Sequence, residues 1–175
     1  SSPSPSPAAG PSVEPSIKLG SNSFNEEILR KLQENIRSNP DDQTSKLQLI
    51  QVLNSMASLQ ASQGEVEVAK STLQSALAFD RKSSMTLWNL AVLHYKIGEY
   101  RAAEDLLLKL VESDQRNPQF HYLLGEALYS QDKIPQAISE WETALQGGPN
   151  EQITRRLAKA RQEAPAHKEL GVLQS

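Results

Sequence analysis

The chain has 175 residues, of which 38% are hydrophobic, 22% charged and 5% aromatic, and its formal net charge is −3. This composition is typical of a helical globular protein, and no apolar run is long enough to span a bilayer. The absence of cysteine excludes disulfides, iron–sulfur clusters and thiol catalysis, and the weak negative charge disfavours nucleic-acid binding, which needs a basic surface.

The first 22 residues contain five of the ten prolines of the chain, among Ser, Ala and Gly, with only two charged residues. Such a segment cannot bury a core, so residues 1–22 are expected to form an extended, disordered tether. A Ser/Pro-rich lead resembles the spacer after a bacterial export or lipoprotein signal, and a linker of a cytoplasmic protein has the same composition. The compartment is left open, with the periplasm or cell envelope slightly favoured.

Residues 23–49 are expected to hold an N-terminal capping helix and the start of a longer helix. Ser23 and Glu26 have the spacing of a capping box, and the apolar residues that follow share one stripe. That stripe consists of Phe24, Ile28, Leu32 and Ile36. The longer helix is expected from about Gln43 to Gly64. Its inward face is predicted to consist of Leu47, Ile50, Leu53 and Ala57.

From residue 50 onward, small and apolar residues recur with a strict period of 34 residues and without gaps. The small residues form three columns: Ala57, Ala91 and Gly125; Ala69, Ala103 and Ala137; and Gly64, Gly98 and Asp132. Three further apolar columns keep the same register: Met56, Leu90 and Leu124; Leu73, Leu107 and Trp141; and Ala76, Leu110 and Ala144. A fixed period of this length indicates stacked structural repeats.

The pattern resembles the tetratricopeptide repeat family, whose unit is two antiparallel helices in 34 residues, with a small residue at their crossing and a glycine between them. The resemblance divides the chain into three contiguous repeats, residues 50–83, 84–117 and 118–151. The second is the clearest, with Tyr-Lys-Ile-Gly-Glu-Tyr at 95–100 followed by Ala103. The family implies an all-α fold, a right-handed α-α superhelix (tetratricopeptide solenoid) with N- and C-terminal capping helices.

A C-terminal capping helix is expected over residues 152–164, because Asn150 can cap its start and apolar residues can cover the last repeat. These inward residues are Ile153, Leu157 and Ala160. Its basic residues are assigned to a solvated face rather than to an anion site. Pro165 is expected to end the helix, so that residues 165–175 form a tail. A tail without a periodic pattern suggests that a further domain follows.

The sequence contains no motif of a catalytic or metal site: a phosphate-binding loop, a nucleophile elbow and a zinc-binding helix motif are all missing. His94 and His121 take inward positions, where a packed, hydrogen-bonded imidazole is expected rather than a ligand or a base. His167 falls in the expected tail. The chain is therefore predicted to be no enzyme, with no catalytic residue, metal or cofactor.

Function is expected to depend on the concave surface, which the first helix of each repeat lines, as the family resemblance implies. In the first repeat this surface is small and polar, with Gln51, Asn54, Ser55, Ser58, Ala61 and Ser62. The candidate partner-binding residues are Asn54, Met85, Trp88, Asn89, Val92, Tyr95, Gln119, Tyr122, Glu126 and Tyr129. Large rigid side chains with a polar end are typical of protein-binding hot spots. A protein or peptide partner is expected there, with internal packing or self-association as the alternative.

The residues argue against one known mode of binding in this family. Repeats that hold acidic chaperone tails use a carboxylate clamp of Lys and Asn, then Asn, then Lys and Arg, and only Asn89 matches that set. Recognition is therefore expected through apolar and neutral hydrogen-bonding contacts. A second interpretation is that the chain is the docking or regulatory portion of a larger enzyme, in a bacterial envelope for example, whose catalytic domain lies outside it.

Overall fold

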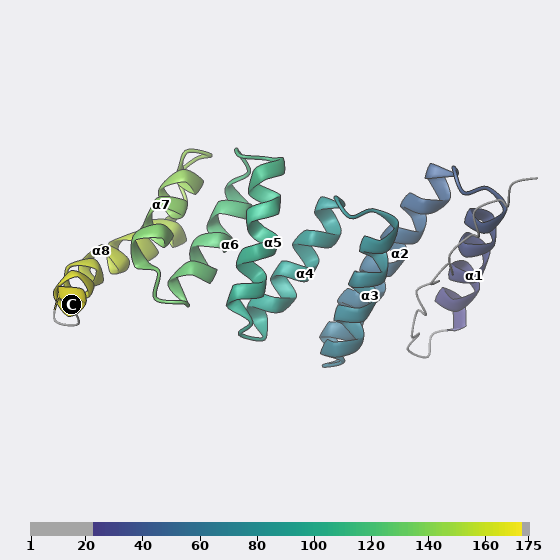
Figure 1. The fold of residues 1–175 in the computed structure, drawn as a ribbon, viewed down its shortest axis with the longest axis horizontal. Helices are drawn as coiled ribbons and strands as arrows, with labels where there is room; N and C mark the ends of the chain where they lie inside the picture. The colour runs from purple at the N-terminus through teal and green to yellow at the C-terminus, as the bar shows by residue number, and fades with distance from the viewer. Residues whose placement is uncertain (1–22, 173–175) are drawn as a thin grey trace, which may run out of the picture.

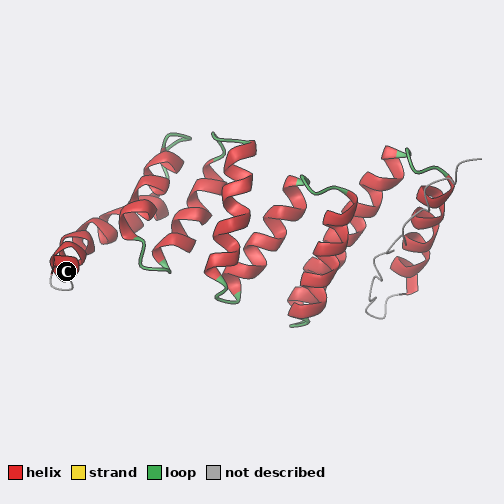
Figure 2. Cartoon of the chain, in the orientation of Figure 1, coloured by secondary structure: helices red, strands yellow, loops and turns green. Residues whose placement is uncertain are grey.

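A computed structural model describes residues 23–172, with side chains over 25–164, as a row of α-helices (Figure 1). The helices are α1 (Ser23–Ser38), α2 (Gln43–Ser62), α3 (Val66–Phe79), α4 (Ser84–Lys96), α5 (Tyr100–Ser113), α6 (Pro118–Tyr129), α7 (Ile134–Leu145) and α8 (Glu151–Val172). Every regular element of this part is helical (Figure 2). The predicted tether over residues 1–22 lies outside the described residues.

Three antiparallel pairs, α2 with α3, α4 with α5 and α6 with α7, stack side by side, while α1 and α8 occupy the two ends (Figure 1). This arrangement is the all-α superhelix that the sequence predicts. The alanines of the second small column, Ala69, Ala103 and Ala137, are all fully buried. Larger side chains there would separate the helix axes, so the period of 34 reflects repeated close packing.

The third small column marks the turn inside each repeat. Gly64 and Gly98 both have φ of +82°, and Asp132 takes the same left-handed region at +63°. At each turn the next residue's backbone N–H reaches back over the helix end; Glu65, for example, donates to the carbonyl of Gln60 at 2.9 Å. Aspartate tolerates this conformation better than most residues, so the third repeat keeps the turn without glycine.

The structure differs from the sequence prediction at two helix positions near the ends of the array. Leu47 was expected inside, yet it is 59% exposed, because α1 packs against Leu49 and Met56 on another side of α2. At the other end α8 continues through Pro165 to Val172. Proline removes one helix hydrogen bond, but the alanines on both sides have the highest helix propensity, and the helix continues.

The junctions between repeats carry ion pairs with exchanged charges. Lys70 Nζ lies 3.3 Å from Glu99 Oε1 between the first and second repeats. One period later, Glu104 Oε2 lies 2.7 Å from Lys133 Nζ between the second and third. The acid and the base are therefore exchanged between the two junctions, so direct packing of the third repeat on the first would place Lys133 beside Lys70.

We expect Glu104→Lys to lower the free energy of unfolding by about 1–3 kcal/mol, because it replaces a half-buried charge-assisted pair with repulsion from Lys133. The double variant Glu104→Lys, Lys133→Glu restores opposite charges and should recover most of that loss. Gln131, which donates to Glu104 at 2.7 Å, can turn its amide to accept from the new lysine. Urea unfolding of the three chains measures this, and a double variant no better than the single would contradict it.

Candidate functional site

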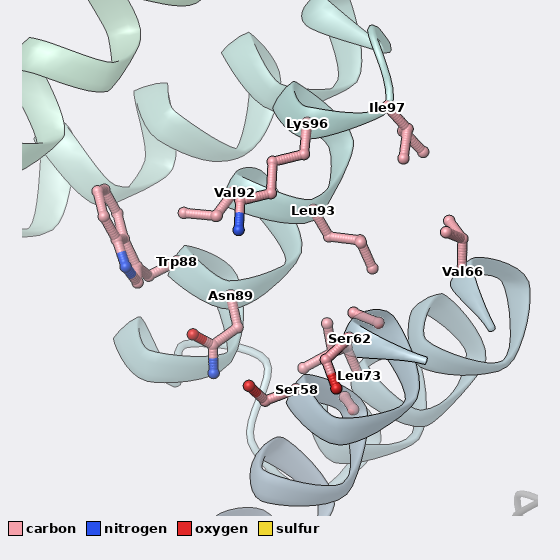
Figure 3. A pocket seen from close by; sticks show the side chains of 12 residues that line it. Ser58, Ser62, Val66, Leu73, Trp88, Asn89, Val92, Leu93, Lys96 and Ile97 are labelled. Carbon is pink, nitrogen blue, oxygen red and sulfur yellow. The ribbon is translucent and has the colours of Figure 1, made fainter. Parts of the chain in front are cut away.

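A pocket of about 350 Å³ opens between the first helices of the first two repeats (Figure 3). The first helices of the repeats, α2, α4 and α6, line the surface predicted to be concave, and we refer to it as the concave surface. The pocket residues are Ala57, Ser58, Ala61 and Ser62 of α2, Val66 and Leu73 of α3, Trp88, Asn89, Val92, Leu93 and Lys96 of α4, and Ile97, which follows α4. Three predicted partner-binding residues, Trp88, Asn89 and Val92, thus meet at one cavity.

The pocket exists because the concave residues of α2 are small. One residue on its wall, Ala61, stands in the same column as Tyr95 and Tyr129 of the later repeats. Between α4 and α6 the corresponding space is occupied by Tyr95, whose hydroxyl lies 3.4 Å from Glu126 Oε2. The polar stretch of the first repeat therefore borders a pocket on the concave surface.

Behind the pocket, two asparagines join the first repeat to the second. Asn54 is 4% exposed and its amide donates to the Ile50 carbonyl and to Thr86 Oγ1, both at 2.8 Å. The amide of Asn89 donates to Asn54 Oδ1 at 2.8 Å. This chain of bonds fixes the Asn89 side chain, so its carbonyl oxygen is held in place as an acceptor beside the pocket. Asn54 itself is occupied and serves as a support.

The aromatic half of the concave surface is covered by α8. Gln152 donates to the Tyr122 hydroxyl at 2.6 Å, and Tyr129 donates to Glu163 Oε2 at 2.7 Å. Lys159 lies 5.6 Å from the centre of the Tyr129 ring. Two of the four tyrosines are thus engaged from within the chain, which is the internal packing that the sequence analysis left open.

Glu126 is the most deeply buried charged residue of the concave surface. Its carboxyl is 5% exposed and lies 2.9 Å from Arg156 Nη2 of α8. Burial raises the pKa of Glu126, and the opposing effects of Arg156 and of the Tyr95 hydroxyl are smaller. Its second oxygen has no hydrogen-bond partner among the described residues. Glu126 is therefore a structural residue under α8, not an open contact for a partner.

We expect the stability difference between the wild type and Glu126→Gln to depend on pH. A raised carboxyl pKa gives the folded state an advantage at low pH, which is lost as pH rises through the folded pKa. The glutamine variant has no such loss, so it should gain stability relative to the wild type as the pH rises above 4.5, the ordinary pKa of a glutamate carboxyl. Urea unfolding over a pH series that spans this value tests the prediction, and a constant difference would contradict it.

The remaining predicted residues lie outside the pocket. Met85, at the start of α4, is 44% exposed, and Gln119 is exposed on the first turn of α6. Tyr95 packs against Tyr100 with ring centres 5.5 Å apart. The structure therefore separates the ten candidates into three at the pocket and seven that support it, pack inside or stand apart.

Sequence reasoning missed three α8 residues that reach the concave surface, namely Gln152, Arg156 and Glu163. A signal for two of them was present, because the period of 34 continues past the third repeat. Arg156 falls in the column of Trp88 and Tyr122, and Glu163 in that of Tyr129. The helix that was predicted only as a cap thus takes the place of the first helix of a further repeat. Its side chains contribute to the concave surface.

The described part of the chain offers little support for a catalytic histidine or a metal site. His94 contacts the Glu99 carboxylate, and His121 Nδ1 lies 2.6 Å from Glu140 Oε2 with Nε2 2.9 Å from the Gln115 carbonyl. Both imidazoles are thus packed and bonded to neighbours, as expected. Over the same residues no group of three or more His, Asp or Glu could hold a metal ion, and none of the helices has the length and apolar character needed to cross a bilayer.

The helix pairs, the period and the turns define a helical-repeat protein. The sequence model of the tetratricopeptide repeat matches residues 54–115 and 89–151, which together make up more than half of the chain. The chain therefore belongs to the tetratricopeptide repeat family. No curated protein sequence matches it significantly.

Solved structures share this fold. The first tetratricopeptide domain of Spaghetti (RPAP3), bound to the HSP90 peptide SRMEEVD, is 20% identical with a TM-score of 0.64, and the match covers 67% of this chain and 94% of that one. MamA of Desulfovibrio magneticus RS-1 is 22% identical with a TM-score of 0.63, covering 83% and 78%. A variant of the O-GlcNAc transferase of Thermobaculum terrenum is 26% identical with a TM-score of 0.59, covering 66% and 22%.

Proposed function

We propose that this chain is a non-catalytic protein-interaction module that binds a peptide segment of a partner on its concave surface. The observation that carries the proposal is the open pocket between α2 and α4, where Trp88, Asn89 and Val92 meet. A concave site with apolar walls and a few fixed polar groups has the form of a binding site. The Trp88 ring packs against Phe120 in a tilted arrangement, with ring centres 5.6 Å apart, so this large ring is held at the pocket edge.

The similar RPAP3 domain supports peptide binding as a function of this fold, since its structure contains a bound HSP90 peptide. The same ligand is not proposed here. At the clamp positions of the first repeat, Asn54 is buried and already bonded, and in the third repeat Leu123 is 8% exposed and apolar. The cations that would hold a peptide carboxylate in a clamp are missing, so a different class of segment is required.

Affinity capture from an extract of the source cells tests the proposal. The wild type, Trp88→Ala and the control Leu108→Ala, a 49% exposed residue of the second helix α5, serve as baits, with the bound proteins identified by mass spectrometry. A partner held through the pocket should be retained by the wild type and the control, and should bind Trp88→Ala about 30-fold more weakly. Circular dichroism establishes that all three are folded. Capture of the same proteins by all three would overturn the proposal.

A second candidate is the docking portion of a larger enzyme. The observation that favours it is the match to the O-GlcNAc transferase, of whose length this chain spans about a fifth. The full reading frame tests it, since a catalytic domain in the same frame would support this role and a frame without one would exclude it. The same frame would also show whether an export or lipoprotein signal precedes the Ser/Pro-rich segment.

A further inference from the structure

We infer that the partner segment places an apolar side chain in the pocket between α2 and α4 and a neighbouring carboxylate against Lys96. This inference rests on the proposed function and specifies its ligand as an acidic segment with an apolar anchor. Three features carry it: the lining of the pocket, the charge of the helices α2 and α4, and the position of Lys96.

The pocket suits one or two side chains rather than a large ligand. Its volume of about 350 Å³ is at the small end of the range of about 300–1,000 Å³ found for ligand pockets. Most of its walls are carbon, from small or aliphatic residues such as Ala61, Leu73 and Val92. Burying an apolar side chain there removes hydrocarbon surface from water on both partners, which supplies the anchor.

The first helices of the two repeats that border the pocket, α2 and α4, carry no negative charge, whereas α3, which contributes Val66 and Leu73 to the pocket, carries Glu67. Residues 43–64 and 83–98, which include all of α2 and α4, contain no Asp or Glu, although the chain has 21 acidic residues. The acidic side chains of the neighbouring segments, such as Glu67 and Glu99, lie on α3 and just before α5. A chain with a net charge of −3 thus has a concave surface around the pocket that is neutral to positive. That polarity favours a negatively charged segment.

Lys96 supplies the positive charge at the pocket. It is exposed and lies at the end of α4, and Figure 3 shows its side chain extending along the helix toward Val92 and Asn89. No ion pair to Lys96 is formed within the described residues, whereas Lys70 and Lys133 each contact a carboxylate. An ammonium beside an apolar cavity can receive the carboxylate of an acidic residue next to the anchor. The fixed carbonyl oxygen of Asn89 can accept a hydrogen bond from a backbone N–H of the same segment.

Peptide selection by phage display tests this inference with an unbiased probe, a random library of about twelve residues. We expect the wild type to enrich sequences in which a large apolar residue has Asp or Glu within two positions. The variant Lys96→Glu should keep the apolar residue and enrich Lys or Arg beside it. The control Lys109→Glu, with the same change of charge on the outer helix α5, should select the same acidic sequences as the wild type.

For one enriched peptide, replacing its acidic residue by the neutral amide should raise Kd about threefold to fivefold for the wild type. The same replacement should lower Kd for Lys96→Glu, because it removes the repulsion between two carboxylates. Ala61→Phe, which fills the pocket, should bind the peptide at least tenfold more weakly while keeping its helical circular dichroism. Equal binding by Ala61→Phe would overturn the inference.

The outcomes separate the inference from the proposed function. If Lys96→Glu still selects acidic peptides, or if the wild type selects apolar peptides without carboxylates, the inference is overturned while peptide binding stands. If the wild type selects no peptide above background, the inference is overturned together with the pocket as a peptide site.

Discussion

Ala103→Asp should unfold the central repeat. Ala103 is fully buried in α5, within the core that joins the second and third repeats, so its replacement puts an unpaired carboxylate into a close helix crossing. An uncompensated buried charge costs about 3–5 kcal/mol, a large part of the stability of a small domain. Each repeat is stabilised by its neighbours, so the loss should extend to the repeats on both sides.

Thermal and urea unfolding followed by circular dichroism measures this effect. The matched control is Ala102→Asp, at the preceding residue on the same helix, where the side chain is half-buried rather than fully buried. The control should melt near the wild type, and Ala103→Asp should melt far below it or be unfolded. Equal melting of the two variants would mean that the repeat register is wrong.

Gly125→Ala should destabilise the third repeat, because among the described glycines Gly125 has the closest neighbouring atoms around an added methyl group. A Cβ at this position would lie 2.5 Å from Cδ1 and Nε1 of Trp141, closer than real Cβ contacts. Trp141 is fully buried and its Nε1 donates to the Tyr122 carbonyl at 3.2 Å, so the ring cannot move aside without losing that bond. We expect a net destabilisation of about 1–3 kcal/mol, despite the better helix propensity of alanine.

The other repeats show how this clash can be relieved. Their equivalent pairs are Ala57 with Leu73 and Ala91 with Leu107, whereas the third repeat combines the glycine with the tryptophan. The double variant Gly125→Ala, Trp141→Leu recreates the pair of the other repeats. It should be more stable than the sum of the two single changes predicts, and urea unfolding of the four chains gives the coupling energy. Strict additivity would show that the two columns do not compensate.

The sequence predicted best where the same packing is repeated. A column of alanines with a period of 34 corresponds to one crossing made three times, so the full burial of Ala69, Ala103 and Ala137 could be predicted without coordinates. The left-handed turn at Asp132 followed from its column for the same reason. These features depend on local steric limits to residue size and backbone conformation. Such limits recur with the repeat, so they can be read from the spacing of small residues.

The candidate site was less predictable because it depends on side-chain contacts between neighbouring repeats. The column that contains Trp88 could be read from the sequence. The contact of the Tyr95 hydroxyl with Glu126, and the cover over Tyr122 by α8, arise from side chains of adjacent repeats. The position of Lys96 on the concave surface could be predicted from the sequence, but its place on the wall of a pocket depends on the packing of α2 against α4.

The most direct test of the central claim, that a partner segment binds in the pocket between α2 and α4, is the NMR correlation spectrum of the two tryptophan indole N–H groups. The spectrum is recorded while a peptide selected on the wild type is added. Trp88 lines the pocket, and Trp141 is fully buried and bonded to the Tyr122 carbonyl, so it serves as an internal control. The account predicts that the Trp88 signal shifts to saturation while the Trp141 signal stays in place. A bound peptide that leaves the Trp88 signal unchanged would contradict it.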